Sequence, residues 1–192
     1  KRRRLPFSSE GNADWNAADA SDGLISLREA IQAANTNAPA GDAPAGDAGQ
    51  DIIEFDLSAA SSSTIVLTEG EFSVVEDLQI NASSAVTIDA GSNSRLFNID
   101  TNSTVSASGL TLTNGSSADN GGAILVAAGS SLSFDSGEIN NSQSDMSGGA
   151  IWVGGGLTLS GSTLDTNIAS LSGGALAIAA SATDPGLWRR CS

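Results

Sequence analysis

Histidine and tyrosine are absent from the sequence, and its 192 residues include only one cysteine, five phenylalanines and three tryptophans. Without histidine, acid–base chemistry at neutral pH would have to rely on carboxylates or an arginine. The single cysteine, Cys191, has no partner within the chain, which excludes a scaffold held by internal disulfides. No stretch approaches the roughly 18 apolar residues of a membrane span, and the basic start KRRR lacks the apolar run of a signal peptide.

Basic residues are scarce away from the ends. Residues 1–4 and 189–190 hold six of the eight, so only Arg28 and Arg95 lie between them, against 22 acidic residues, a net charge of −20. Such a surface repels phosphates and anionic lipids, which predicts no nucleic-acid partner and no membrane insertion. The basic ends differ abruptly from the rest. We interpret residues 1–21 as an N-terminal arm and 183–192 as a tail, both partly foreign to the natural protein.

Residues 22–37 (DGLISLREAIQAANTN) predict the only helix of the sequence. Ser26 followed by Glu29 is a capping box, in which the serine accepts from first-turn amides and the glutamate reaches back. Four apolar residues then fall on one face: Leu27, Ala30, Ile31 and Ala34. A helix this short is stable only when it packs on something, so we predict that it caps the structure that follows.

Residues 38–50 (APAGDAPAGDAGQ) contain a near-duplicate of APAGD. Proline and glycine break regular structure, so we predict an exposed, extended loop. The repeated Asp42 and Asp47 are more readily explained as part of a surface insertion than as ligands of a cation.

Residues 51–182 consist of short runs of β-forming residues broken by Gly, Ser, Asn or Asp. Within them GGAILV, GGAIWV and GGALAI begin at Gly121, Gly148 and Gly173, at intervals of 27 and 25 residues. We attribute the two-residue difference to a loop that shortens from VAAGSSLSF to VGGGLTL and leaves the strands in register. A period near 25 with three short strands and no helix is typical of one rung, or turn, of a parallel β-helix.

Stacked rungs place equivalent residues in ladders along the axis. We predict three inward ladders: Ile124, Ile151 and Leu176; Val126, Val153 and Ile178; and Leu112, Ile139 and Leu164. The glycine pairs turn a corner at which a Cβ would clash or φ must be positive, and Asn amides at a second corner bond to turn backbone groups. The predicted turn residues are Gly121, Gly122, Gly148, Gly149, Gly173, Gly174, Asn114 and Asn141.

Two segments resemble a known class of proteins. DGLISLREAIQAAN (22–35) followed by DIIEFDL (51–57) is similar to the SLREAI segment that opens bacterial secreted β-helix proteins, although the usual cysteine is replaced by Ile25. The GGA[IL] repeats are similar to those of chlamydial polymorphic outer-membrane proteins and related adhesin-like proteins. The resemblance implies an all-β fold, a right-handed, single-stranded parallel β-helix of the pectate-lyase type with an N-terminal capping helix. It also implies secretion or display at the bacterial outer membrane. Because the repeat pattern stops after ALAIAA without a matching cap, we expect the natural protein to continue with further rungs or domains.

Arg95 and Trp152 are the candidate ligand-binding residues. Arg95, the one basic residue within the rungs, would serve a polysaccharide-active enzyme as a base, or form a surface ion pair with Asp89 or Asp100. Trp152 is predicted to point outward between Leu125 and Ala177, where it would stack on a sugar ring or lie under a neighbouring loop.

The leading hypothesis is a non-catalytic scaffold outside the cell, an adhesin-like or passenger module that meets glycans or a neighbouring or host cell surface. One alternative is the N-terminal part of a polysaccharide lyase or hydrolase with its active site elsewhere. Another is a carbohydrate-binding module that uses Trp152. No cofactor is expected. A structural Ca²⁺ at a turn is left open as an alternative, but no motif specifies its ligands. Threonines at 111–113 and 157–160 faintly resemble ice-binding ladders, but no in-register recurrence is expected.

Overall fold

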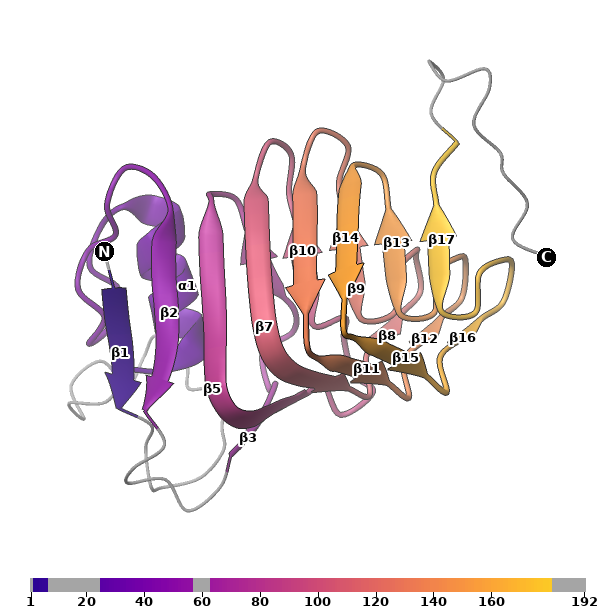
Figure 1. Ribbon diagram of the computed structural model, residues 1–192, viewed down its shortest axis with the longest axis horizontal. Helices are drawn as coiled ribbons and strands as arrows, with labels where there is room; N and C mark the ends of the chain where they lie inside the picture. The colour runs from indigo at the N-terminus through magenta and orange to yellow at the C-terminus, as the bar shows by residue number, and fades with distance from the viewer. Residues whose placement is uncertain (1, 7–24, 57–62, 181–192) are drawn as a thin grey trace.

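The chain forms a parallel β-helix of about four turns, with one short helix near the N-terminus, as expected from the sequence (Figure 1). The computed structural model describes residues 2–6, 25–56 and 63–180. The strands of each rung pair in parallel with those of the next rung. Equivalent strands are therefore stacked along the axis of the coil, in three sheets.

The first sheet has nine strands, in the order β1-β2-β5-β7-β10-β14 with β3 on β5 and with β11 between β7 and β15. These are β1 (Arg2–Pro6), β2 (Asp51–Asp56), β3 (Thr64–Val66), β5 (Leu78–Asp89), β7 (Thr104–Thr113), β10 (Ser131–Asp135), β11 (Glu138–Asn140), β14 (Gly156–Ser160) and β15 (Thr163–Asp165). The second has five strands: β4 (Phe72–Val74), β6 (Phe97–Ile99), β9 (Ile124–Val126), β13 (Ile151–Val153) and β17 (Leu176–Ile178). The third has β8 (Ser116–Ser117), β12 (Gln143–Ser144) and β16 (Ile168–Ala169).

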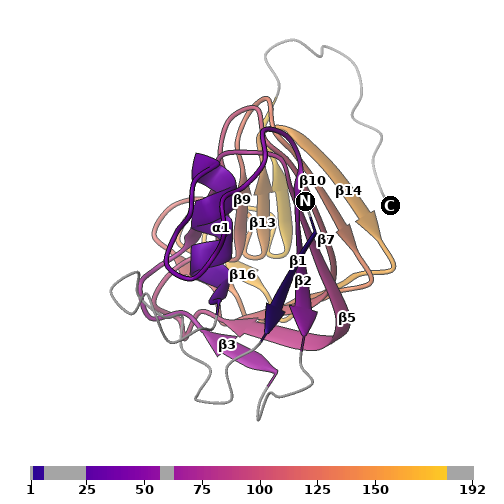
Figure 2. The same ribbon diagram turned by 90° about the vertical axis from the view of Figure 1, so that its left-hand side faces the viewer.

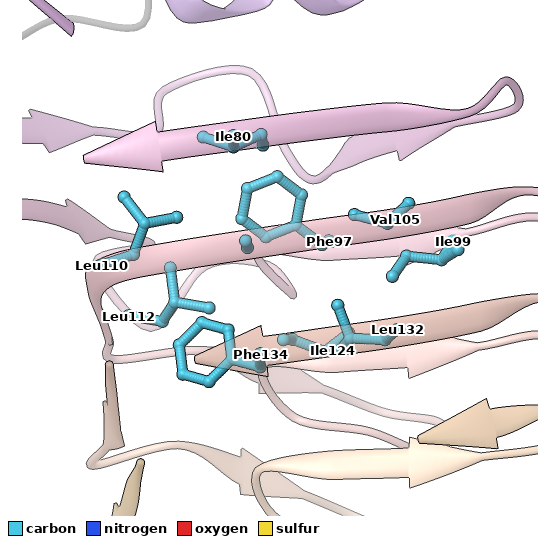
Figure 3. Close-up of a pocket in the computed structure, with 10 residues that line it drawn as sticks. Ile80, Phe97, Ile99, Val105, Leu110, Leu112, Ile124, Leu132 and Phe134 are labelled. Atoms are coloured by element: carbon cyan, nitrogen blue, oxygen red, sulfur yellow. The ribbon is translucent and has the colours of Figure 1, made fainter. Parts of the chain in front are cut away.

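All three predicted ladders are present in register, and each extends into earlier rungs. Phe72 and Phe97 continue the ladder of Ile124, with ring centres 5.3 Å apart. The shortened loop also keeps the strands aligned, because Ser131 pairs with Gly156. The interior is apolar and closely packed (Figure 3). Its void of about 10 Å³ between the aromatic rings is at the lower limit for one water and offers it no polar partner.

The glycine corners have the geometry that the repeat predicts. The first glycine of each pair has φ between +63° and +73°, a region that favours glycine. The second glycine lacks room instead: a Cβ on Gly122 would lie 2.2 Å from the carbonyl oxygen of Gly149, and one on Gly149 would lie 1.9 Å from that of Gly174. The corners at Gly121–Gly122 and Gly148–Gly149 therefore require both glycines, for different reasons. At the last corner a Cβ on Gly174 would find its nearest atom at 3.2 Å, so only Gly173 is required there.

Asn114, Asn141 and Thr166 occupy the second corner with φ of 55°, 51° and 51°. The side chains do not bond to turn backbone groups as predicted. The amide of Asn114 donates to the Asp89 carboxylate (2.8 Å), and the oxygen of Asn141 accepts from the Thr166 hydroxyl (3.0 Å). The corner is thus held by side chains of neighbouring rungs, and the left-handed backbone explains the asparagines.

Helix α1 (Leu27–Thr36) begins at the predicted capping box, with both Ser26–Glu29 hydrogen bonds present, and ends at Asn37 with φ of 53°. The predicted apolar face is buried. Figure 2, which looks at the N-terminal end, shows α1 over the coil on the side of β9 and β13. Asn35 donates to the carbonyl of Ser73 (2.8 Å) and accepts from the amide of Val75 (3.0 Å). Because β4 is the outermost strand of its sheet, α1 replaces the missing strand partner.

Residues 38–50 were expected to be exposed and extended, and this is wrong for part of the segment. Ala40 and Ala43 form an antiparallel bridge and are buried against Ala33. The Glu29 carboxylate accepts from the amide of Asp42 (3.3 Å), so the capping box also holds this loop. Of the N-terminal arm, residues 2–6 form β1 on β2; the tail 183–192 lies outside the described residues.

The last described rung differs from the others in its exposure. Ile178 is 60% exposed, whereas Val153, its partner one rung earlier, is buried. Ile168 and Leu171 are 67% and 70% exposed, and they follow Gln143 and Met146, which are exposed as well. In the described part of the chain, no helix has the length and apolar character needed to cross a bilayer.

Candidate functional site

Arg95 is buried at the junction of three rungs, with 9% of its surface exposed. Phe97 pairs with Ile124, so Arg95 takes the position that Gly122 has in the next rung. Its Nε donates to the carbonyl of Gly121 (2.7 Å) and its Nη2 to that of Asn120 (2.9 Å).

The same guanidinium donates to the Ser117 hydroxyl (2.8 Å) and forms an ion pair with Glu71. The expected partners, Asp89 and Asp100, are not used. Arg95 therefore links its own rung to the glycine corner of the next rung. It stands where that corner has Gly122, and its side chain donates to the carbonyls of Asn120 and Gly121.

Arg28 joins the capping helix to the same region. Its Nη2 donates to the carbonyl of Gly70 (2.6 Å) and its Nη1 to that of Glu71 (3.3 Å). The guanidinium carbon lies 4.7 Å from the centre of the Phe72 ring, a cation–π distance. Arg28 and Arg95, the two arginines between the basic ends, thus both contact one segment, residues 70–72.

A cavity of about 270 Å³ opens beside this segment, between α1 and β4. Its lining includes the buried side chains of Ile31 and Phe72 and the polar side chains of Arg28, Gln32, Glu71 and Ser73. The Glu71 side chain is 33% exposed, so it is accessible from solvent while Arg95 holds it from behind. We call this space the α1–β4 cavity.

Trp152 is half-buried and points out of the five-stranded sheet, because Ile151 and Val153 on either side are buried. It pairs with Leu125 and Ala177, as predicted. The ring lies against Gly154: a Cβ there would approach Cζ3 of the indole to 2.9 Å.

The outward row of Trp152 continues through Leu125 and Asn98 to Ser73 in the α1–β4 cavity. Sequence reasoning singled out Trp152 but not Gln32, Ser73 or Asn98. One available signal was the alignment of SRLFNI with GGAILV, because an arginine at a glycine position marks a modified corner.

Threonine does recur in register, contrary to expectation. Thr64, Thr87, Thr111 and Thr163 form one outward row, interrupted by Glu138. The adjacent row contains Asp89 and Asp165 beside amide and hydroxyl groups. This face is therefore mixed and partly charged, unlike a uniform hydroxyl surface.

Carboxylates are scattered in the part of the chain that the structure describes. Among those residues, no group of three or more Asp, Glu, His or Cys side chains is arranged to hold a metal ion. Comparison with protein families, curated proteins and solved structures finds no match to this chain.

Proposed function

We propose that this chain is a non-catalytic scaffold module that acts outside the cell, as an adhesin-like or passenger segment of a β-helix. The observation that carries the proposal is the commitment of Arg95 to structure. It is the one basic side chain in the rungs, and its guanidinium binds two backbone carbonyls, Ser117 and Glu71. A base or substrate clamp needs an accessible group within hydrogen-bond reach of a substrate.

The extracellular location is supported by the SLREAI-type segment and the GGA[IL] repeats, and by the acidic, soluble surface. The exposure of Ile178 supports a continuation of the coil, because its partner Val153 is buried where a further rung covers it. Antibody labelling of intact cells that carry the native gene tests the location. We expect surface labelling, and signal only after lysis would refute it.

Catalysis is tested by incubating the chain with pectate, alginate and neutral glucans and measuring new reducing ends and unsaturated products. We expect no release above that of buffer. Product formation that is lost in Arg95→Met, in a sample shown to be folded, would overturn the scaffold proposal and assign Arg95 to an active site.

Carbohydrate binding at Trp152 is a second candidate function. It is favoured by an outward indole in a row with Leu125 and Asn98, because an exposed aromatic face stacks on the apolar face of a sugar ring. Affinity electrophoresis in gels that contain a neutral polysaccharide tests it. We expect retardation of the wild type and less retardation of Trp152→Ala; equal mobility of the two proteins would refute it.

A further inference from the structure

We propose that the α1–β4 cavity holds the terminal sugar of a neutral glycan whose chain runs along the outer face of the five-stranded sheet to Trp152. The proposal rests on the glycan-binding candidate, whereas the scaffold function stands without it.

The size and lining of the α1–β4 cavity fit one sugar ring. Drug-sized ligands occupy pockets of roughly 300–1,000 Å³, so a cavity of about 270 Å³ admits a single ring. Most of the accessible lining is apolar, although Ile31 and Phe72 themselves are buried, and Gln32, Glu71 and Ser73 offer polar groups to sugar hydroxyls. A pyranose has this combination of an apolar face and a polar edge.

The polar groups at the rim retain hydrogen-bonding capacity. Glu71 uses Oε2 for Arg95, and within the described residues its Oε1 has no hydrogen-bond partner. The hydroxyl of Ser73 and the amide of Gln32 likewise have none in that part of the chain. Arg95 fixes the Glu71 carboxylate, so this acceptor is preorganised and loses little entropy when a hydroxyl binds.

The path from the α1–β4 cavity to Trp152 follows successive rungs. Ser73, Asn98, Leu125 and Trp152 are in register on adjacent strands, and Figure 1 shows β9, β13 and β17 of this sheet side by side. Three strand spacings of about 4.8 Å separate Ser73 from Trp152 by roughly 14 Å. A short oligosaccharide therefore spans both contacts, with the Asn98 amide available between them.

Charge selects a neutral ligand. Between the basic ends the net charge is −20, from two basic and 22 acidic residues. Glu71 and Arg28 both line the cavity, and the Arg28 guanidinium already donates to the carbonyls of Gly70 and Glu71. Uronate or sulfate groups would be repelled by this field, whereas sugar hydroxyls donate to the carboxylate without any such cost. The ligand class is therefore a neutral hexose polymer.

The test is calorimetric titration of the full chain with neutral gluco-, manno- and galacto-oligosaccharides of one to six units. In the series that binds, affinity should rise with length until the chain reaches Trp152 and then level off. Gln32→Ala and Ser73→Ala should each weaken binding of every length about five- to tenfold, because each removes one hydrogen bond worth roughly 1 kcal/mol. Trp152→Ala should leave short sugars unaffected and abolish the gain with length.

Thr163→Ala is the matched control, an exposed outward hydroxyl on another sheet, and should bind as the wild type does. Gln32 and Ser73 are also exposed, so their variants should fold, which circular dichroism verifies. If Trp152→Ala weakens binding but both cavity variants do not, the cavity proposal fails while glycan binding stands. If no neutral series binds, or uronates bind as tightly, the cavity proposal is overturned; the absence of any binding overturns the glycan-binding candidate as well.

Discussion

Replacing Arg95 with methionine tests whether its guanidinium stabilises the fold or instead serves catalysis. Methionine retains the apolar stem, so packing along the corner is largely preserved. The substitution removes the hydrogen bonds to the carbonyls of Asn120 and Gly121, to the Ser117 hydroxyl and to Glu71. The change therefore reports on the guanidinium and not on the side-chain volume.

The loss of unfolding free energy in Arg95→Met depends on which of the former hydrogen-bond partners are buried. Gly121 lies in the buried corner, and each buried acceptor left without a donor costs about 1–3 kcal/mol. The Glu71 side chain is 33% exposed, so water replaces much of its lost interaction and that ion pair adds little. We therefore expect a loss of about 3 kcal/mol in the free energy of unfolding. For a chain of this size, about 2–4 °C per kcal/mol converts it to roughly 6–12 °C in Tm.

Thermal unfolding followed by circular dichroism measures this loss, and amide hydrogen exchange locates it. Exchange should accelerate first at the amides of Gly121 and Gly122, which bond to the next rung. Arg95→Lys should lose about half as much, because one ammonium cannot reach four separate partners. A Tm of Arg95→Met within about 1 °C of the wild type would refute this reasoning and leave the guanidinium available for a ligand.

Three further predictions concern the ends and corners of the coil. Asn35→Ala should lower the unfolding free energy by about 0.5–1.5 kcal/mol, because the exposed carbonyl of Ser73 and amide of Val75 exchange their partner for water; denaturant titration measures the loss, and light scattering should show more self-association. Thr166→Asn should raise the free energy of unfolding by up to about 1 kcal/mol, measured as a higher denaturant midpoint, because asparagine tolerates φ of 51° better than a β-branched residue. Gly149→Ala should abolish folding or cost more than about 3 kcal/mol, whereas Gly174→Ala, whose Cβ would find its nearest atom at 3.2 Å, should be tolerated; equal stability of the two would contradict the steric explanation.

The later rungs could be predicted from sequence because their corners carry a chemical signature. A positive φ and a missing Cβ both demand glycine, so GGA[IL] marks each corner and fixes the register of residues such as Ile124 and Ile151. The helix was equally predictable, because a capping box and one apolar stripe are local features.

The earlier rungs and the candidate site were not predictable in the same way. There the corner glycines give way to Arg95 and its neighbours, whose partners lie 22 to 26 residues away. Long-range hydrogen bonds leave no periodic pattern in the sequence. An arginine in a Ser/Asn-rich loop therefore cannot be distinguished by sequence from an arginine on the surface. The same applies to Arg28, which sequence would place in solvent and the structure places on the carbonyls of Gly70 and Glu71.

The corner that carries Arg95 in place of a glycine lies beside α1 and the proposed glycan site. In the later rungs a corner of two glycines leads into each of β9, β13 and β17. Beside α1 the chain instead uses Arg95, whose charge is balanced by a glutamate that faces a cavity. Capping the coil requires Arg28 and Asn35 at the edge of β4, but it requires neither Glu71 at the rim nor a cavity beside it. The combination is therefore more than an end cap needs, and the glycan proposal accounts for it.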